Sequence, residues 1–374
     1  MVVLGVVCLS GVTACGSDSD TKDEPDAPAA TADAGASSKV VEDAKANLKT
    51  LLAPAKLEGD APFKANSGKK LGVLNCGAAI PLCNVMVDNA KEAAAALGWT
   101  VVTVDGKLSP QGWNTGMKQL IAQKPDLILS NIAQDSAIPQ PLAAAAKAKI
   151  PVACAYCANT FDKPVANPAQ ANADNDYRAQ AQAAADTIIA QSDGKARVAV
   201  LSFNLNIAPR TRVEAFKKAM KKCAECEVVA SEEIGATSDP AGKTRTITRA
   251  ILSKFPAGDL DWIVSPADSY TVGVTQAVKL SRRDDVKVLG YDCNPDAAVD
   301  DVRTGASEGC IDSSVYPSVW AAIDQLARID AGVPHKKLVP LPFQIVSKNN
   351  APAAGKPVFS FDYKGYYKNL WKGE

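Results

Sequence analysis

The chain has 374 residues, enough for two ordinary domains around a shared cleft, and 47 % of them are hydrophobic, so a substantial core can be buried. Lys and Arg number 41, as do Asp and Glu, which gives a formal net charge of zero rather than the basic excess typical of nucleic-acid binding proteins. His335 is the one histidine, so a His-rich metal site or a Ser-His-Asp or Cys-His mechanism would depend on it alone. We therefore expect no catalytic residues, no metal site and no nucleic-acid partner.

The N-terminal residues resemble a bacterial lipoprotein leader. Residues 2–9 are apolar but too few to span a bilayer, and they lead into Val12-Thr13-Ala14-Cys15-Gly16, which is similar to a lipobox. We expect residues 1–15 to form a signal peptide, with cleavage before Cys15 and a lipid on its thiol. A signal peptide has a basic residue before its apolar segment, but no Lys or Arg precedes the apolar residues here. Either the beginning is truncated, or the segment is a buried N-terminal strand instead.

The next segment changes from polar to amphipathic. Residues 16–38 have no large apolar side chain, so they cannot bury enough surface to offset their ordering entropy, and we expect a disordered tether. Residues 39–68 are expected to form an N-terminal helix and a linker. The helix is predicted because Val40, Val41, Ala44, Leu48, Leu51 and Leu52 recur at helical spacing.

From residue 69 onward, short β-branched segments alternate with Ala-rich segments of helical periodicity. The strand candidates are Leu71–Asn75, Thr100–Val104, Asp126–Ser130, Pro151–Ala155, Arg197–Leu201, Glu227–Ala230, Asp261–Ser265, Lys287–Gly290 and Gly309–Asp312. Repeated βαβ units require parallel sheets covered by helices on both faces, so the fold class is α/β. Ligands bind to such sheets outside the carboxyl ends of the strands, which makes the residues after each strand the candidate site.

Phosphate-binding motifs are incomplete. Gly242-Lys243-Thr244 resembles the end of a P-loop, but the glycine required five residues earlier is Thr237. No Gly-x-Gly-x-x-Gly follows a strand candidate. We expect no nucleotide and no other cofactor.

Eight cysteines remain once Cys8 and Cys15 are assigned to the leader, and an even number fits an oxidising compartment. They are Cys76, Cys83, Cys154, Cys157, Cys223, Cys226, Cys293 and Cys310. Three couples (76/83, 154/157 and 223/226) are close in sequence and leave 293 with 310, so we favour four disulfides. The two Cys-x-x-Cys pairs could instead bind zinc, although they lie too far apart for a compact finger. A thioredoxin-like redox role for Cys154-Ala155-Tyr156-Cys157 is a further alternative.

Seven short motifs are spread along the chain, and their order and spacing matter as much as their residues. They are Ile80-Pro81-Leu82-Cys83, Leu129-Ser130-Asn131, Ile150-Pro151-Val152, Asn172-Ala173-Asp174-Asn175, Arg212-Val213-Glu214-Ala215-Phe216, Pro266-Ala267-Asp268 and Val288-Leu289-Gly290-Tyr291-Asp292. With this order and spacing, residues 69–349 resemble the ribose-type periplasmic sugar-binding proteins, the solute receptors of ABC importers. The resemblance implies a periplasmic binding protein type I fold, in which two Rossmann-like lobes joined by three crossovers close over a ligand. It places the first lobe at 69–173 plus 315–345 and the second at 174–314 plus 346–374 with the C-terminal aromatic tail.

The resemblance also implies ligand-binding residues. Asn131, Arg212 and Asp292 match polar ligand-binding positions of the family, and Asp268 matches the acid of its Asn-Asp step. A carboxylate accepts hydrogen bonds, a guanidinium donates them and an amide does both, which suits sugar hydroxyls. Ser313, directly after a strand candidate, is a further candidate. From the residues alone, Arg212 could instead be a solvated helix residue and Asp292 a helix cap.

Several positions depart from the family pattern. The Asp-Arg pair that grips the sugar is replaced by Tyr156 and Cys157, and the paired aromatic residues of the first loop are replaced by Leu82 and Cys83. The Asn of the Asn-Asp step is Ala267. The predicted pocket is therefore more apolar, with Leu82 and Tyr156 among its ligand-binding residues. Tyr156 could stack on a sugar face or an aromatic ligand, or simply pack beside a disulfide.

We expect a lipid-anchored, monomeric substrate-binding protein at the cell surface or in the periplasm, and not an enzyme. It would capture a small solute, with sugar favoured, and deliver it to an ABC permease and its ATPase. The same fold could instead bind a small aromatic or other polar non-sugar solute, or serve as a ligand-sensing receptor subunit. A thiol oxidoreductase is a further alternative. A lactose-repressor-type regulator would need a helix-turn-helix where this chain has its leader and tether.

The C-terminal segment from Phe359 to Trp371 is dense in Phe, Tyr and Trp. Such a segment is expected to pack back on a lobe, and a partner-docking patch is the alternative.

Overall fold

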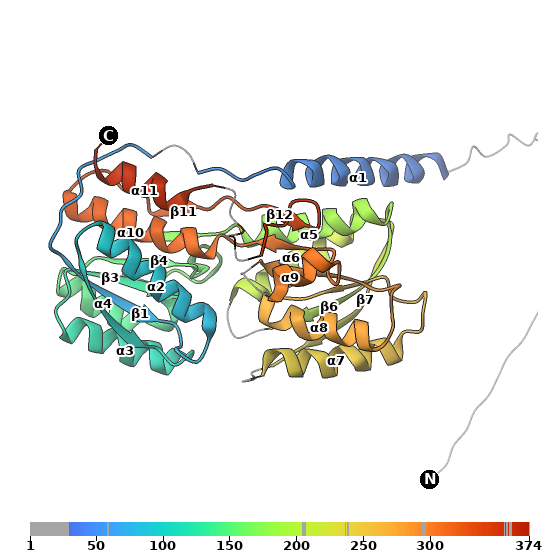
Figure 1. The fold of residues 1–374 in the computed structure, drawn as a ribbon, viewed down its shortest axis with the longest axis horizontal. Coiled ribbons are helices and arrows are strands. Elements are labelled where there is room, and N and C mark those ends of the chain that lie inside the picture. Colours follow the sequence, from blue (N-terminus) through green and yellow to red (C-terminus); the bar gives the residue numbers. More distant parts are fainter. Residues whose placement is uncertain are drawn as a thin grey trace, which may run out of the picture.

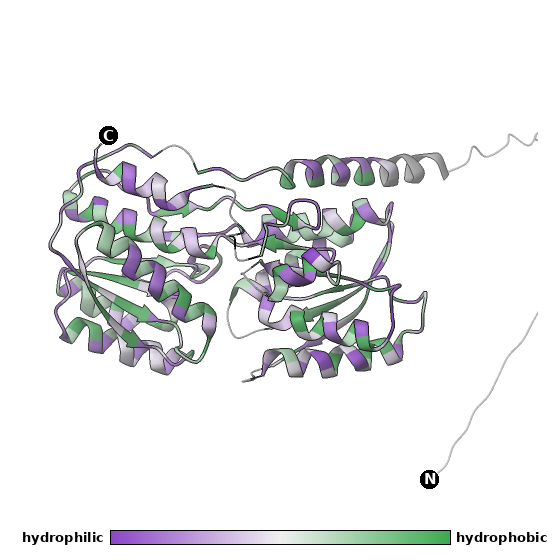
Figure 2. Ribbon diagram, viewed as in Figure 1, coloured by the Kyte–Doolittle hydropathy of each residue, from purple (hydrophilic) through white to green (hydrophobic). Residues whose placement is uncertain are grey.

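In the computed structural model, two α/β lobes lie side by side (Figure 1). The structure describes residues 30–57, 60–203, 207–235, 237, 239–293, 297–354, 356, 358 and 361–373, and the side chains from residue 38 onward. The expected signal peptide with Cys15, and residues 16–29 of the expected tether, lie outside the described residues. Apolar residues concentrate in the strands and on the helix faces turned toward them (Figure 2).

The first lobe is built on a parallel six-stranded sheet with the order β11-β5-β4-β3-β1-β2. Its strands are β1 (Lys70–Asn75), β2 (Thr100–Asp105), β3 (Leu127–Asn131), β4 (Val152–Ala155), β5 (Ala171–Asp174) and β11 (Leu338–Pro340). Helices α2 (Pro81–Ala96) and α10 (Val315–Ala331) cover one face, and α3 (Pro110–Ala122) and α4 (Pro139–Lys147) cover the other. A proline at the first position of α2, α3 and α4 fixes where each helix begins.

The second lobe repeats this plan with the order β12-β10-β9-β8-β6-β7. Its strands are β6 (Lys195–Ser202), β7 (Glu225–Glu233), β8 (Trp262–Val264), β9 (Lys287–Asp292), β10 (Gly309–Asp312) and β12 (Ile345–Ser347), the last of which is antiparallel to β10. Helices α5 (Tyr177–Gln191) and α6 (Ile207–Met220) cover one face, and α7 (Pro240–Lys254) and α8 (Asp268–Leu280) cover the other. The short α9 (Ala297–Thr304) precedes β10.

The chain passes between the two sheets after β5, after β10 and after β11. The predicted α/β class with two parallel-sheet lobes is confirmed by this topology. β5, β11 and β12 were not among the strand candidates. β5 reads Ala-Asn-Ala-Asp and has no β-branched residue, so its strand conformation depends on pairing with β4 and β11.

An additional helix, α1 (Ala30–Leu51), packs along α5 of the second lobe (Figure 1). It begins inside the expected tether, so the predicted boundary after residue 38 is too late. The Ala-rich composition of residues 30–36 explains the difference, because alanine has the highest intrinsic helix propensity. Among the described helices, none combines the length and the apolar character needed to cross a bilayer.

The aromatic C-terminal segment forms α11 (Tyr363–Trp371) and packs on a lobe, but not on the expected one. The Trp371 ring stacks on Trp320 of α10 with 5.5 Å between centroids, and the Leu370 carbonyl accepts the backbone N–H of Phe63 at 2.8 Å. The assignment of this tail to the second lobe is therefore wrong. The aromatic rings of α11 are buried on the first lobe, against the apolar surface of α10 and beside residues 63–65.

The eight cysteines form four disulfides, with the pairing that their spacing favours: 76–83, 154–157, 223–226 and 293–310. Because each of these eight cysteines is in a disulfide, none has a free thiolate that could bind zinc in this structure. Within the described part of the chain, no group of three His, Cys, Asp or Glu side chains could hold a metal ion.

Candidate functional site

The carboxyl ends of the central strands of both sheets face each other across the cleft between the lobes. Asn131 is the last residue of β3, and Tyr156 directly follows β4. In the second lobe Asp292 is the last residue of β9, and Ser313 directly follows β10. These are the positions at which doubly wound sheets bind ligands.

Arg212 of α6 lies where the strand ends of the two lobes meet, and its side chain is only 3 % exposed. Its Nη2 atom lies 3.0 Å from Asp292 Oδ1 and 2.7 Å from Ser313 Oγ. Ser313 in turn donates to Asp292 Oδ1 at 2.7 Å. The interpretations of Arg212 as a solvated residue and of Asp292 as a helix cap are therefore wrong, because both side chains are buried in one ion pair. We call Arg212, Asp292, Ser313 and Tyr156 the cleft cluster.

Tyr156 is the member of the cleft cluster that comes from the first lobe. Its hydroxyl donates to Asp292 Oδ1 at 2.7 Å and accepts from Arg212 Nη2 at 2.9 Å. Burial raises the pKa of this phenol well above its usual value, so the group stays protonated and can donate. Its position beside the Cys154–Cys157 disulfide was expected as one alternative, but the contact made by its hydroxyl across the cleft was not.

Three residues of the second lobe surround the guanidinium and were missed in the sequence. Gln180 Oε1 accepts from Arg212 Nε at 3.1 Å and from Nη2 at 2.9 Å. The rings of Tyr177 and Tyr291 lie with their centroids 5.1 Å and 4.6 Å from the guanidinium carbon. Tyr177 and Gln180 occupy the first turn of α5, one helical turn apart, directly after a crossover, and that placement is a signal that could have identified them.

Several buried polar atoms near the cleft cluster have no hydrogen-bond partner. Both amide atoms of Asn131, which is fully buried, are unpaired. Asn175 Oδ1, the Tyr291 hydroxyl and Asp312 Oδ2 are likewise buried and unpaired. Because folded proteins pair nearly all such groups, a concentration of unpaired ones at the strand ends indicates a place where a polar ligand completes the hydrogen bonding.

The backbone at these strand ends is held in the left-handed region. φ is +65° at Ile132, +60° at Tyr156, +85° at Asp292 and +45° at Ser314. None of these residues is a glycine, and such backbone conformations persist only where the surrounding structure enforces them, often at functional sites.

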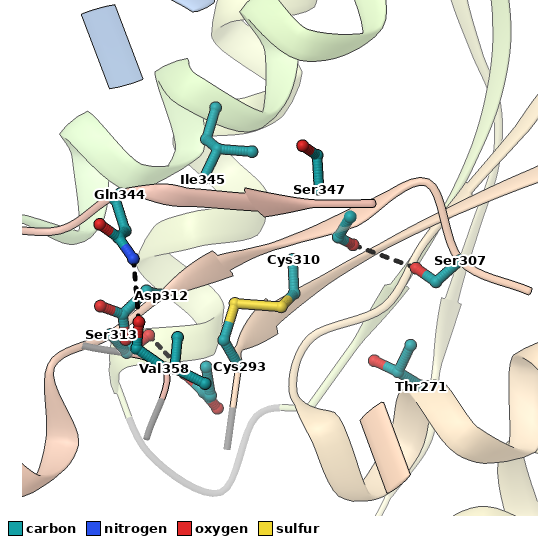
Figure 3. The surroundings of a disulfide bond; sticks show 12 residues. Thr271, Cys293, Ser307, Cys310, Asp312, Ser313, Gln344, Ile345, Ser347 and Val358 are labelled. Atoms are coloured by element: carbon teal, nitrogen blue, oxygen red, sulfur yellow. Dashed lines mark hydrogen bonds between the residues drawn. A yellow bond between two sulfur atoms is a disulfide. The ribbon is translucent and has the colours of Figure 1, made fainter. Parts of the chain in front are cut away.

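Disulfides restrain two of the same loops. The 154–157 bridge encloses Tyr156, and the 293–310 bridge ties the residue after Asp292 to β10, beside Asp312 and Ser313 (Figure 3). The 223–226 bridge lies between α6 and β7, away from the strand ends that face the cleft. The site loops are thus covalently braced, which preorganises the side chains that they carry.

Two crossovers carry buried carboxyl groups. Asp174 ends β5 and accepts hydrogen bonds from the Tyr177 hydroxyl and from the backbone N–H of Ala158. Asp312 ends β10 opposite Asp292. Burial raises the pKa of Asp174 to about 6 and that of Asp312 to about 8.

The two remaining predicted residues lie at helix starts. Leu82 is in the first turn of α2, half-buried against the core of the first lobe. Asp268 begins α8, two residues after Pro266, whose carbonyl accepts a hydrogen bond from Arg212 Nη1 at 3.4 Å. A hollow of about 430 Å³ lies between Phe161 of the first lobe and α5 and α6 of the second, and none of the cleft-cluster residues lines it.

Comparison with known sequences gives one family. Residues 71–332 match the family described as "Periplasmic binding protein domain". No curated protein sequence matches the chain.

Solved structures with the same fold are numerous and distant in sequence. An ABC transporter solute-binding protein from Burkholderia graminis in complex with D-arabinose is 16 % identical, with a TM-score of 0.68 over 79 % of this chain and 100 % of that one. A periplasmic solute-binding protein from Actinobacillus succinogenes with bound D-allose is 18 % identical, with a TM-score of 0.67 over 76 % and 99 %. One from Bacillus halodurans with bound myo-inositol is 17 % identical, with a TM-score of 0.66 over 79 % and 98 %. These likenesses establish the type I fold of this family.

Proposed function

Because this chain belongs to the periplasmic binding protein domain family, whose members are binding proteins and not enzymes, we propose that it captures a small polyhydroxylated solute between its lobes. The solute is a sugar or a sugar alcohol, and the protein delivers it to an ABC permease and its ATPase. The proposal is carried by the polar groups at the facing strand ends: the buried Arg212–Asp292 pair of the second lobe, and the fully buried Asn131 of the first lobe, whose amide has no partner.

The hydrogen-bonding groups suit hydroxyls on a compact ring or chain. Asp292 accepts, Arg212 donates through a planar fork, and Asn131 can do both, so one solute with vicinal hydroxyls can satisfy all three. The bound solutes named for three proteins of this fold, D-arabinose, D-allose and myo-inositol, all belong to this chemical class.

The location of the groups favours capture by lobe closure. Asn131 and Tyr156 belong to the first lobe, whereas Arg212 and Asp292 belong to the second, and three crossovers join the two. A solute that bridges the two sets of groups stabilises the closed arrangement, and opening releases it to a permease. A lipid on Cys15 would hold the protein beside that permease, with the segment before α1 as the connection.

A binding screen tests the proposal. Oxidised protein is mixed with pentoses, hexoses, sugar alcohols and inositols, and separately with amino acids and aromatic acids, and its unfolding midpoint is measured. A solute at 100 times its dissociation constant adds about 2.7 kcal/mol to the free energy of unfolding and raises the midpoint by several degrees. Positive solutes are then titrated calorimetrically.

Two variants locate the binding. Asp292→Asn should abolish the shift, whereas Asp259→Asn, which changes an exposed carboxylate on the far end of the second lobe, should leave it unchanged. Shifts with aromatic acids or amino acids alone would overturn the sugar class and favour a polar non-sugar solute. No shift with any compound, or an unchanged shift in Asp292→Asn, would overturn the proposed site.

A further inference from the structure

We propose that Tyr156 is a built-in occupant of the solute site: its hydroxyl fills the position between Asp292 and Arg212 that a solute hydroxyl takes when the protein is loaded. This inference rests on the function proposed above and adds a residue that controls which solutes bind. A solute must bring a hydroxyl that replaces the phenol, so capture is a displacement rather than the filling of an open pocket.

The hydrogen bonds of the phenol are those expected of a solute hydroxyl. It donates to Asp292 Oδ1 at 2.7 Å and accepts from Arg212 Nη2 at 2.9 Å, so it satisfies an anion and a cation with one oxygen. A sugar hydroxyl has the same donor and acceptor capacity. Both charged groups are nearly fully buried, which makes these hydrogen bonds stronger than those of an exposed hydroxyl.

The contact also joins the lobes. Arg212, Asp292 and Ser313 are contributed by α6, β9 and the residue after β10, whereas Tyr156 follows β4 of the other sheet. The edge of its ring meets Tyr177 at a centroid distance of 5.7 Å, and the 154–157 disulfide encloses its backbone. The phenol therefore adds to the other contacts between the lobes, such as those of Phe161 with Tyr177 and Arg178.

Asn131 shows that this self-contact leaves the site incomplete. β3 and β4 are neighbours, and the backbone N–H of Ile132 donates to the Ala155 carbonyl at 3.0 Å, so Asn131 and Tyr156 lie on adjacent strand ends. The phenol satisfies the second-lobe charges but neither amide atom of Asn131. A solute with at least two hydroxyls can replace the phenol and also pair with Asn131, which gives it the advantage over the tyrosine.

The test removes only the hydroxyl. Tyr156→Phe is compared with the unmodified protein and with Tyr367→Phe, a change of a buried tyrosine in α11 whose hydroxyl has no partner. Without the competing phenol, we expect the dissociation constant of the best sugar or sugar alcohol from the screen to fall about tenfold to a hundredfold, the range set by a hydrogen bond to a charged group. Tyr367→Phe should leave it unchanged. Circular dichroism and unfolding midpoints confirm that both variants fold.

A second measurement needs no solute. Small-angle X-ray scattering of the solute-free proteins should show a larger radius of gyration for Tyr156→Phe, because the lobes lose their hydrogen bonds to the charged pair, and no change for Tyr367→Phe. An unchanged radius for Tyr156→Phe, or an unchanged or weakened affinity, would overturn the inference while leaving the proposed function in place. A larger radius in a protein that binds no member of the panel would support the lobe contact and overturn the proposed solute class.

Discussion

Among the residues that the structure describes, two arginine–aspartate pairs are buried: one where the lobes meet and one within the first lobe. Arg328 Nε donates to Asp324 Oδ2 at 2.7 Å within α10, and Trp371 of α11 donates to Asp324 Oδ1 at 2.9 Å. Arg328 Nη2 also donates to the Ala61 carbonyl at 2.8 Å, and its guanidinium lies over the Phe63 ring at 4.5 Å. Each oxygen of this carboxylate has a partner, and every partner lies on the first lobe.

The cleft pair, Arg212 and Asp292, differs in two respects. It receives a hydrogen bond from the opposite lobe through Tyr156, and the strand next to the one that Tyr156 follows ends with the unpaired Asn131. Water can reach it when the lobes separate, whereas Asp324 of the α10 pair is fully buried and bonded to Trp371 of α11. The Arg328–Asp324 network is completely paired within one lobe, so it stabilises the fold. The Arg212–Asp292 network lies between the lobes and is incompletely paired, so it can bind a ligand.

The largest change in the free energy of unfolding is expected when each pair is broken in turn. Arg328→Met should lower the free energy of unfolding by about 3–5 kcal/mol, because it leaves Asp324 buried without its cation. Arg212→Met should lower it by less, since opening of the lobes hydrates Asp292. Denaturant unfolding of both variants measures the difference, and an equal or greater loss for Arg212→Met would contradict the distinction between the two pairs.

The second comparison uses two asparagines of the first lobe, the fully buried Asn131 and the half-buried Asn89. Asn131→Leu removes unpaired polar atoms, so the solute-free protein should keep its stability or gain up to about 1–3 kcal/mol, while solute binding is lost. Asn89 is paired: its Oδ1 accepts from Trp320 and Tyr363. Asn89→Leu should therefore be destabilising. Unfolding midpoints measure the stability of both variants, and calorimetric titration measures their solute binding. A destabilised Asn131→Leu variant would show that the amide has a structural role.

A third comparison uses the two Cys-x-x-Cys bridges. Replacing Cys154 and Cys157 by Ala frees the loop that carries Tyr156, so solute affinity should change severalfold, in the direction found for Tyr156→Phe. The same double replacement at Cys223 and Cys226 removes a bridge of equal span outside the cleft and should leave affinity unchanged. Equal effects on affinity would mean that the bridges act only through global stability.

A pH dependence of stability is expected from the crossover carboxyl groups. The pKa of Asp312 is raised by burial to about 8, against about 3.9 in an unfolded chain. Between these values the native protein holds a proton that the unfolded chain has lost, so stability falls as the pH rises from about 4 to about 8. Asp174, with a pKa of about 6, acts in the same sense.

Asp312→Asn should flatten this dependence. Urea unfolding at pH 5 and pH 8 measures it, with Asp285→Asn as the control for a surface carboxylate. An undiminished fall in stability in Asp312→Asn would assign the pH dependence to other groups.

Much of this architecture could be predicted from the sequence because it depends on local patterns. Alternating apolar segments identified most strands of both sheets, and the order of the strands placed Asp292 at a carboxyl end. Arg212 was found only through the resemblance to a family, since a basic residue early in a helix is otherwise unremarkable. Gln180 and Tyr177 were missed because their role depends on how α5 meets α6 in three dimensions. The position of α11 was missed for a related reason, since an aromatic helix can pack on either lobe and the surface of α10 decides which.

The central claim is tested most directly by a crystal structure of the oxidised protein with its tightest-binding sugar or sugar alcohol. We predict that a solute hydroxyl lies between Asp292 and Arg212, that the solute pairs with the Asn131 amide, and that the Tyr156 hydroxyl has left Asp292. A solute bound elsewhere, with the 2.7 Å contact between Tyr156 and Asp292 retained, would contradict this account.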